Sequence, residues 1–222
     1  MRRFLLSATL AVSLFGICPQ AHAAIITGVT VESAVQGNNF SFGPERLLDS
    51  DSMSDMPATA SSTLDPDTID GWLSEKLTGD PFPELVLDLG SNYDVDQLIL
   101  WGWNQNVVQS RTWKDFTIEF SQDNLTFAAS TPLLMNLPTG DNLAETANPF
   151  DVSGVLGSSN ARYVRLKAST NFGITSPDLT QIFALGKLRF DGTAAVPEPS
   201  TLALALLGLL SLCMTGRRRR HR

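Results

Sequence analysis

The middle of the chain is a series of short segments in which apolar and polar residues alternate. Residues 84–89, 115–120 and 162–167 are clear cases, and the second places Phe116 and Ile118 on one side. A period of two puts alternate side chains on one face of a β-strand. Turn residues separate the segments, and no sustained helical period occurs between them. The pattern therefore predicts an all-β fold, an antiparallel sandwich.

The expected strands are bounded by turns and by two long polar stretches. They cover residues 26–31, 84–89, 97–103, 115–120, 125–134, 162–167 and 185–190. Gly90-Ser91-Asn92 is expected to form a turn between two of them. The polar stretches 37–71 and 139–160 are too long for simple turns, so we expect insertions or binding loops there.

Histidine and cysteine are absent from residues 24–196. Both kinds of residue occur only toward the ends, as Cys18, Cys213, His22 and His221. A disulfide, a His/Cys zinc site, a cysteine nucleophile and a Ser-His-Asp triad are therefore excluded within this region.

The N-terminus has the three parts of a secretory signal. Arg2 and Arg3 precede an apolar run, which leads to the small residues around Ala23. These features predict a signal peptide over residues 1–23, with cleavage between Ala23 and Ala24. A lipoprotein signal is disfavoured because Ile17, before Cys18, is not small. An exported domain over residues 24–192 follows.

The C-terminus combines a Pro-Glu-Pro motif, an apolar run and a block of arginines. Pro197, Glu198 and Pro199 fall in an expected linker, residues 193–200. The predicted transmembrane segment is 201–216, and the predicted cytoplasmic tail is 217–222. Because a bilayer core about 30 Å thick needs about 20 helical residues, this span needs its flanks. The arginines favour the cytoplasmic side, which places the preceding domain outside.

This arrangement resembles the PEP-CTERM sorting signal of Gram-negative bacteria. The resemblance implies that an exosortase, a membrane protease-transferase, cuts near Pro197-Glu198-Pro199 and releases or re-attaches the domain. The expected location is the cell envelope, the cell surface or the medium. An ordinary membrane anchor preceded by a chance pair of prolines is the alternative.

The exported domain is strongly acidic. Residues 24–196 contain nine Lys and Arg against 22 Asp and Glu, a net charge of −13. A broad nucleic-acid-binding face is excluded because it requires clustered positive charge. Cation binding is compatible with this charge, although acidity often serves only solubility.

Five segments carry a second resemblance by their order along the chain. They are residues 45–51, 71–74, 83–90, 111–123 and 161–166. Together they resemble the discoidin, or coagulation factor 5/8 type C, family, which includes bacterial galactose-binding-like modules. The resemblance implies a jelly-roll sandwich of about eight strands, with ligand-binding loops at one end.

A calcium site is one implication of this family, and the sequence departs from it twice. The family's Asp-Gly turn is Asp49-Ser50 here, and Lys187 stands where a glutamate usually helps to hold calcium. Asp49, Asp51 and Asp55 are still candidate ligands for Ca²⁺, which takes six to eight oxygens. The alternative is that these carboxylates are only solvated.

Sugar binding requires an aromatic face and planar polar side chains. The candidate ligand-binding residues are Trp72, Trp103, Asn104, Gln105, Asn106, Arg111 and Trp113. Two alternatives stay open. Trp101 and Trp103 share a strand face and would also suit the core, and Arg111 would also suit bracing Asp115.

Three functions are compatible with these features. The first is a non-catalytic module that binds extracellular carbohydrate such as a polysaccharide. The second is a structural protein of the matrix or biofilm without a specific small ligand. A glycosidase built on two carboxylates is the third, but the Asp and Glu residues are scattered. We therefore predict that the chain is not an enzyme.

Overall fold

The computed structural model describes residues 23–35, 42–49, 53, 63–64, 71–76, 79–103, 109–136, 144–173 and 181–195. Apart from Ala23, the predicted signal peptide lies outside the described residues, as do the tripeptide Pro197-Glu198-Pro199, the predicted transmembrane segment and Asp51, Asp55, Asn104, Gln105 and Asn106. The described part is all-β, as predicted, with two 3₁₀ turns, η1 (Pro44–Leu47) and η2 (Gln109–Arg111). None of its helices is long and apolar enough to cross a membrane.

Eleven strands are assigned in the described residues. They are β1 (Ala24–Ile25), β2 (Thr30–Val35), β3 (Thr63–Leu64), β4 (Trp72–Lys76), β5 (Glu84–Trp101), β6 (Asp115–Ser121), β7 (Thr131–Leu134), β8 (Glu145–Asp151), β9 (Ala161–Ala168), β10 (Gln181–Leu185) and β11 (Lys187–Ala194).

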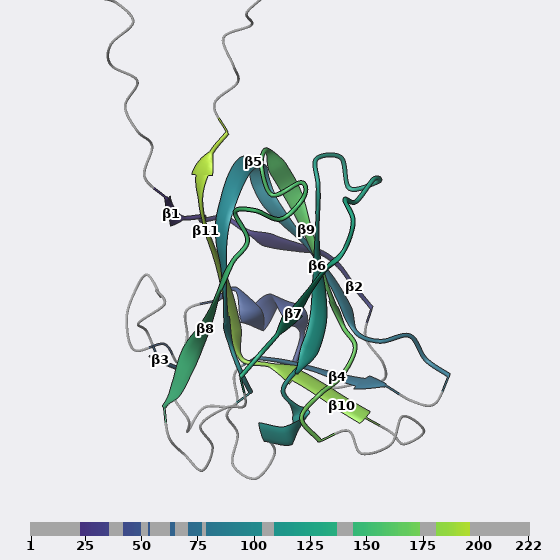
Figure 1. The fold of residues 1–222 in the computed structure, drawn as a ribbon. Helices are drawn as coiled ribbons and strands as arrows, with labels where there is room; N and C mark the ends of the chain where they lie inside the picture. The colour runs from purple at the N-terminus through teal and green to yellow at the C-terminus, as the bar shows by residue number, and fades with distance from the viewer. Residues whose placement is uncertain are drawn as a thin grey trace, which may run out of the picture.

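The long strand β5 belongs to both layers of the sandwich (Figure 1). Its first part pairs with β2 and β9, and β9 continues the layer to β6 and β7. Its second part pairs with β11 and β8, and β11 continues to β1. All of these pairings are antiparallel, and β4 and β10 form a separate two-stranded ladder.

The turn expected at residues 90–92 is instead a bend within β5, so that prediction is wrong. Gly90 has φ of 81°, and its N–H donates to Asp88 Oδ1 at 2.8 Å. Glycine adopts this left-handed conformation without steric cost. The chain therefore passes from one layer to the other without leaving the strand.

The core lies between the two layers and follows the predicted alternation. Phe116, Ile118 and Phe120 of β6 are each at most 1% exposed, whereas Thr117 and Glu119 are only partly buried. The other strands of the two layers contribute Leu85, Leu87, Leu98, Leu100, Val164, Leu166, Leu188 and Phe190. Burial of these apolar side chains is the main favourable term for the sandwich.

Two other segments differ from the expected strands and loops. Only residues 131–134 of the strand expected at 125–134 are extended, because Asp123 Oδ1 accepts the N–H groups of Leu125 and Thr126, both at 2.9 Å, in a turn. The polar stretch 139–160 contains β8, which pairs with the end of β5.

The strand registers define two ends of the sandwich. At one end, Ala194 lies opposite Tyr93, Tyr93 opposite Ala161, and Tyr163 opposite Ser121. We call this the tail end. At the other, Trp101 lies opposite Lys187, and η2 precedes the start of β6. We call this the loop end.

Candidate functional site

Thr112 is hydrogen-bonded to Trp103, and these two residues flank most of the candidate ligand-binding loop. Its side chain is fully buried; Oγ1 accepts the Trp103 N–H at 2.9 Å and donates to the Trp103 carbonyl at 3.2 Å. This pair of hydrogen bonds joins residues 103 and 112, which lie before and after the segment that contains Asn104, Gln105 and Asn106. We call the joined residues the neck.

A second polypeptide segment begins beside this neck. The Gly173 N–H donates to the Ser110 carbonyl at 2.7 Å, and the Phe172 N–H donates to the Thr112 carbonyl at 3.2 Å. Asn171 Nδ2 donates to the Ile182 carbonyl at 2.7 Å and ties the same region to β10. Residues 104–108 and 174–180 are therefore attached at neighbouring points of the loop end.

The three candidate tryptophans are buried. Trp72 is 1% exposed, Trp103 is 2% exposed and Trp113 is fully buried. The rings of Trp72 and Trp113 pack edge to face with centroids 5.7 Å apart, and Trp103 packs similarly on Phe42 at 6.0 Å. The core alternative, which was stated for Trp101 and Trp103, holds for both of them, and Trp72 and Trp113 are buried as well.

Two of these buried rings carry a donor without an acceptor among the described residues. The indole N–H groups of Trp103 and Trp113 make no hydrogen bond there. A buried donor without a partner costs about 1–3 kcal/mol. A water or hydroxyl oxygen at the loop end would relieve this cost.

Arg111 stands at the end of η2 and is partly exposed. Its guanidinium makes no hydrogen bond or ion pair with any residue in the described ranges. Asp115, which it was expected to brace in one interpretation, instead accepts a hydrogen bond from the Thr170 hydroxyl. Arg111 is therefore the predicted site residue whose polar group can meet a ligand.

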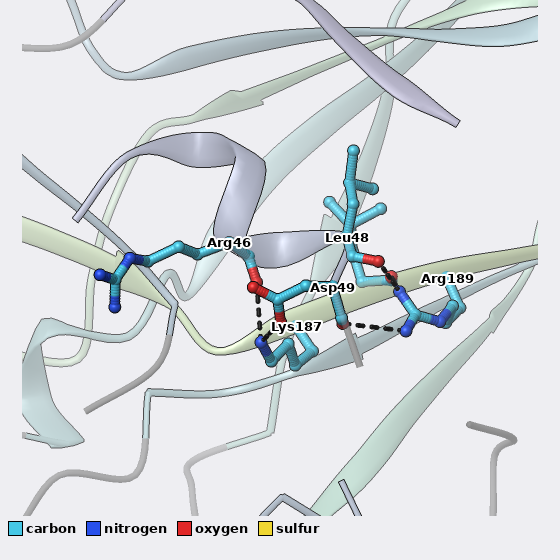
Figure 2. Close-up of polar contacts among 6 residues, drawn as sticks. Arg46, Leu48, Asp49, Lys187 and Arg189 are labelled. Atoms are coloured by element: carbon cyan, nitrogen blue, oxygen red, sulfur yellow. Dashed lines mark hydrogen bonds and ion pairs between the residues drawn. The ribbon is translucent and has the colours of Figure 1, made fainter. Parts of the chain in front are cut away.

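The early acidic loop is held by two basic side chains from β11 (Figure 2). The fully buried Lys187 donates through Nζ to the Arg46 carbonyl at 2.8 Å and to the Asp49 carboxylate. Arg189 donates to the Leu48 carbonyl at 2.9 Å and to the Asp49 carbonyl at 3.0 Å. We call Lys187, Arg189 and the four oxygens of residues 46–49 that they bind the cationic latch.

The described residues of this loop do not fit a calcium ion. The cationic latch occupies the oxygens that a cation would need, and the Lys187 ammonium would repel Ca²⁺. Within the described ranges, no three His, Cys, Asp or Glu side chains gather as metal ligands. Of the three proposed ligands only Asp49 is described, and it is paired with Lys187.

Sequence reasoning missed the structural roles of Thr112, Asn171 and Arg189. Thr112 and Asn171 act through loop contacts that have no short sequence signature. Arg189 had a usable signal, because basic residues two apart in a strand point to the same face. Lys187 and Arg189 are spaced in this way on one strand, far along the chain from the acidic loop that lacks its glycine.

The fold defines a class of domain. The solved structure of the carbohydrate-binding module CBM32-3 from a family 31 glycoside hydrolase of Clostridium perfringens is similar at a TM-score of 0.54 and 19% identity, over 77% of this chain and 95% of that one. This likeness shows a discoidin-like jelly-roll fold.

Two further structures match with lower TM-scores. A fragment of a chitobiase-like protein from Bacteroides thetaiotaomicron gives 0.49 at 18% identity, over 79% of this chain and 95% of that one. The family 32 module of NanJ from C. perfringens, solved with galactose, gives 0.47 at 12%, over 76% and 97%.

A particular sorting signal distinguishes this chain within that class. Residues 195–220 match the model of the PEP-CTERM protein-sorting motif. The motif marks an exported protein sorted to the envelope, as the sequence predicted. No curated protein matches the chain.

Proposed function

We propose that the chain is a non-catalytic module that binds extracellular carbohydrate and is processed by an exosortase in a Gram-negative envelope. The observation that carries this proposal is the fold shared with a carbohydrate-binding module over 77% of the chain. The sorting motif at residues 195–220 supports the location.

The ligand belongs at the loop end in this proposal. Arg111 offers the N–H donors of a partly exposed guanidinium there, whereas the indole N–H groups of Trp103 and Trp113 are buried. Sugar hydroxyls accept hydrogen bonds from such donors. Asn104, Gln105 and Asn106 would supply further polar contacts from the adjoining loop.

Two of the carboxylates described near the loop end support a non-catalytic role. A glycosidase needs two carboxyl groups that are free to act as acid and base or nucleophile. Asp115 is engaged by Thr170, and Asp49 is engaged by Lys187. Both carboxylates are thus tied to structural partners.

Affinity electrophoresis of residues 24–196 against a panel of bacterial polysaccharides tests the proposal. We expect at least one polysaccharide to retard the protein, and Arg111→Ala to weaken that binding about 5- to 30-fold, the equivalent of about 1–2 kcal/mol for a lost charged hydrogen bond. Lys167→Ala is the matched control, because Lys167 is exposed on β9 and makes only a 3.9 Å ion pair.

One specific observation favours a second function. All three candidate tryptophans are buried, so they do not form the aromatic platform common in sugar sites. A structural matrix or biofilm protein without a specific small ligand would have the same property. A folded protein that no polysaccharide retards would support this second function and contradict the first.

A further inference from the structure

We propose that the tail end of the sandwich contacts the lipid surface before processing, so that the loop end points away from the membrane. This inference rests on the proposed sorting, because it requires that the apolar segment after the Pro-Glu-Pro motif be embedded in a bilayer. It goes further by assigning the face of the domain that meets the lipid.

Both ends of the domain leave the sandwich at its tail end. Ala24 of β1 pairs with Gly192 of β11, and β11 ends at Ala194 opposite Tyr93. The Ala195 N–H then donates to the Asn92 carbonyl at 3.0 Å. The described fold is therefore fixed up to the first residue of the sorting motif, and Figure 1 shows β1 beside the end of β11.

The connection from this fixed point to the apolar run is short. Five residues separate Ala195 from Thr201, so even a fully extended chain spans at most about 22 Å. From its first to its last residue, the eight-residue strand β11 extends over about 24 Å. The connection is thus shorter than the strand that separates the tail end from the loop end. Because it leaves from the tail end, it favours contact of that end with the membrane.

The tail end also presents exposed apolar side chains. Leu125 is 86% exposed and Leu156 is 68% exposed, the two highest values for large apolar residues in the described part. Leu125 follows β6 and Leu156 precedes β9, which pair at Ser121 and Tyr163. A groove of about 420 Å³ lined by Phe127 and Leu156 lies between these loops.

The net charge of the domain indicates whether the contact with lipid is electrostatic or apolar. The domain has a net charge of −13, so anionic lipids would repel it as a whole. Apolar side chains that enter the interface, together with the short connection, supply the contact instead. We therefore expect it in zwitterionic vesicles and expect little dependence on salt.

Fluorescence quenching in vesicles tests the orientation. The mature full chain with Cys213→Ser receives a single label, at Leu125→Cys for the tail end or at Ser110→Cys for the loop end. It is reconstituted uncut into phosphatidylcholine vesicles that contain spin-labelled lipid. We expect at least a threefold stronger quenching of the label at position 125. Equal quenching, or stronger quenching at position 110, would overturn the inference.

Two further measurements separate the possible failures. Flotation of the same vesicles reports whether the tail embeds, and a chain that does not float would contradict both the sorting proposal and the inference. Insertion of twenty Gly and Ser residues after Ala195 should reduce quenching at position 125 at least twofold. Leu125→Ser with Leu156→Ser should also reduce quenching, read from a label at Asn124→Cys; unchanged quenching in both variants would contradict the contact.

Discussion

Asp88 and Arg162 form a two-point ion pair on the first part of β5. Arg162 Nε and Nη2 donate to the two carboxylate oxygens of Asp88 at 3.0 and 2.9 Å. The hydrogen bond from Arg162 lowers the pKa of Asp88, with burial opposing it and the Gly90 N–H adding to it. Asp88 therefore favours folding when it is ionised.

We expect Asp88→Asn to lower the free energy of unfolding at pH 7 by about 1–2 kcal/mol, because charged hydrogen bonds are lost. A lowered folded-state pKa gives stability that is present above about pH 4 and is lost as the pH falls through the folded-state pKa. Urea titrations at pH 7 and pH 2.5 should therefore show a larger difference from wild type at pH 7 than at pH 2.5.

Asp191 provides a control of opposite sign. Burial, and then the neighbouring charge of Asp96, raise its pKa, and its Oδ1 has no hydrogen-bond partner in the described residues. Its ionisation therefore opposes folding above the raised pKa. Asp191→Asn should be more stable than wild type at pH 7 and should lose that advantage in acid. The same sign for both variants would contradict this assignment.

The cationic latch makes a prediction about calcium. Lys187→Met leaves the Arg46 carbonyl and the Asp49 carboxylate without their buried cation, and should cost about 2–3 kcal/mol. Millimolar Ca²⁺ should leave the wild-type Tm unchanged, because only a ligand that binds the native state raises it. Thermal melts with and without Ca²⁺ measure both effects.

Lys167→Met is the matched control for that experiment, since the Lys167 side chain is 53% exposed and should contribute less than about 0.5 kcal/mol. A wild-type Tm that rises with Ca²⁺ would contradict the inference that the cationic latch takes the place of a metal ion. A Lys187→Met variant that is as stable as wild type would contradict it too.

At the residue scale, the sequence identified types of side chain better than their surroundings. The spacing of Trp101 and Trp103 placed both on one strand face but could not decide whether that face meets solvent or protein. For Trp103 that depends on Phe42 and Ala184, and for Trp101 it depends on Leu64 and Ala147, all of which are distant in sequence. Lys187 was recognised as unfavourable to calcium, but its partner Arg46 lies 141 residues away.

At the element scale, β5 couples the two layers. We expect Leu98→Ala, in its second part, and Leu166→Ala, in β9, each to cost about 2–5 kcal/mol, because both side chains are fully buried. Since β5 pairs in both layers, unfolding should occur in one transition. Circular dichroism and tryptophan fluorescence during urea unfolding should coincide.

Separate transitions for the two probes would contradict this coupling. Exposed Leu134→Ala is the control, since Leu134 is 58% exposed on β7 and its loss should change stability by less than about 1 kcal/mol.

The alternation predicted β6 and β9 nearly to the residue, because one face of each strand is buried and the other is partly exposed. It could not predict the continuity of β5, since Gly90-Ser91-Asn92 has the composition of a turn and the bend depends on pairing partners. It also missed β8, whose Pro149 and Asn148 are poor strand formers, although they pair with Ile99 and Leu100.

At the scale of the whole molecule, sorting and folding should be separable. Replacing Pro197, Glu198 and Pro199 by alanine should leave uncut protein in the membrane fraction, in a strain that has an exosortase. The Tm of the domain should not change, because in the described part of the chain the last backbone hydrogen bond is the one from Ala195 to Asn92. Immunoblots of fractionated cells and a thermal melt measure the two outcomes.

Pro81→Ala, in the exposed segment before β5, is the control for a general effect of proline loss. Normal processing of the triple alanine variant would show that the tripeptide is not the signal.

The fold class could be predicted because alternation and ordered motifs reflect the whole core. The ligand could not, because it depends on a few side chains in loops.

The position of β11 between β1 and β5 has a mechanical consequence. A pull between the tail and a ligand at the loop end would run along the axis of β11. Its ladders to β1 and β5 would then be loaded in shear, so many hydrogen bonds would have to break together rather than one after another. Such a domain would resist drag from flowing fluid better than one whose terminal strand peels from an edge.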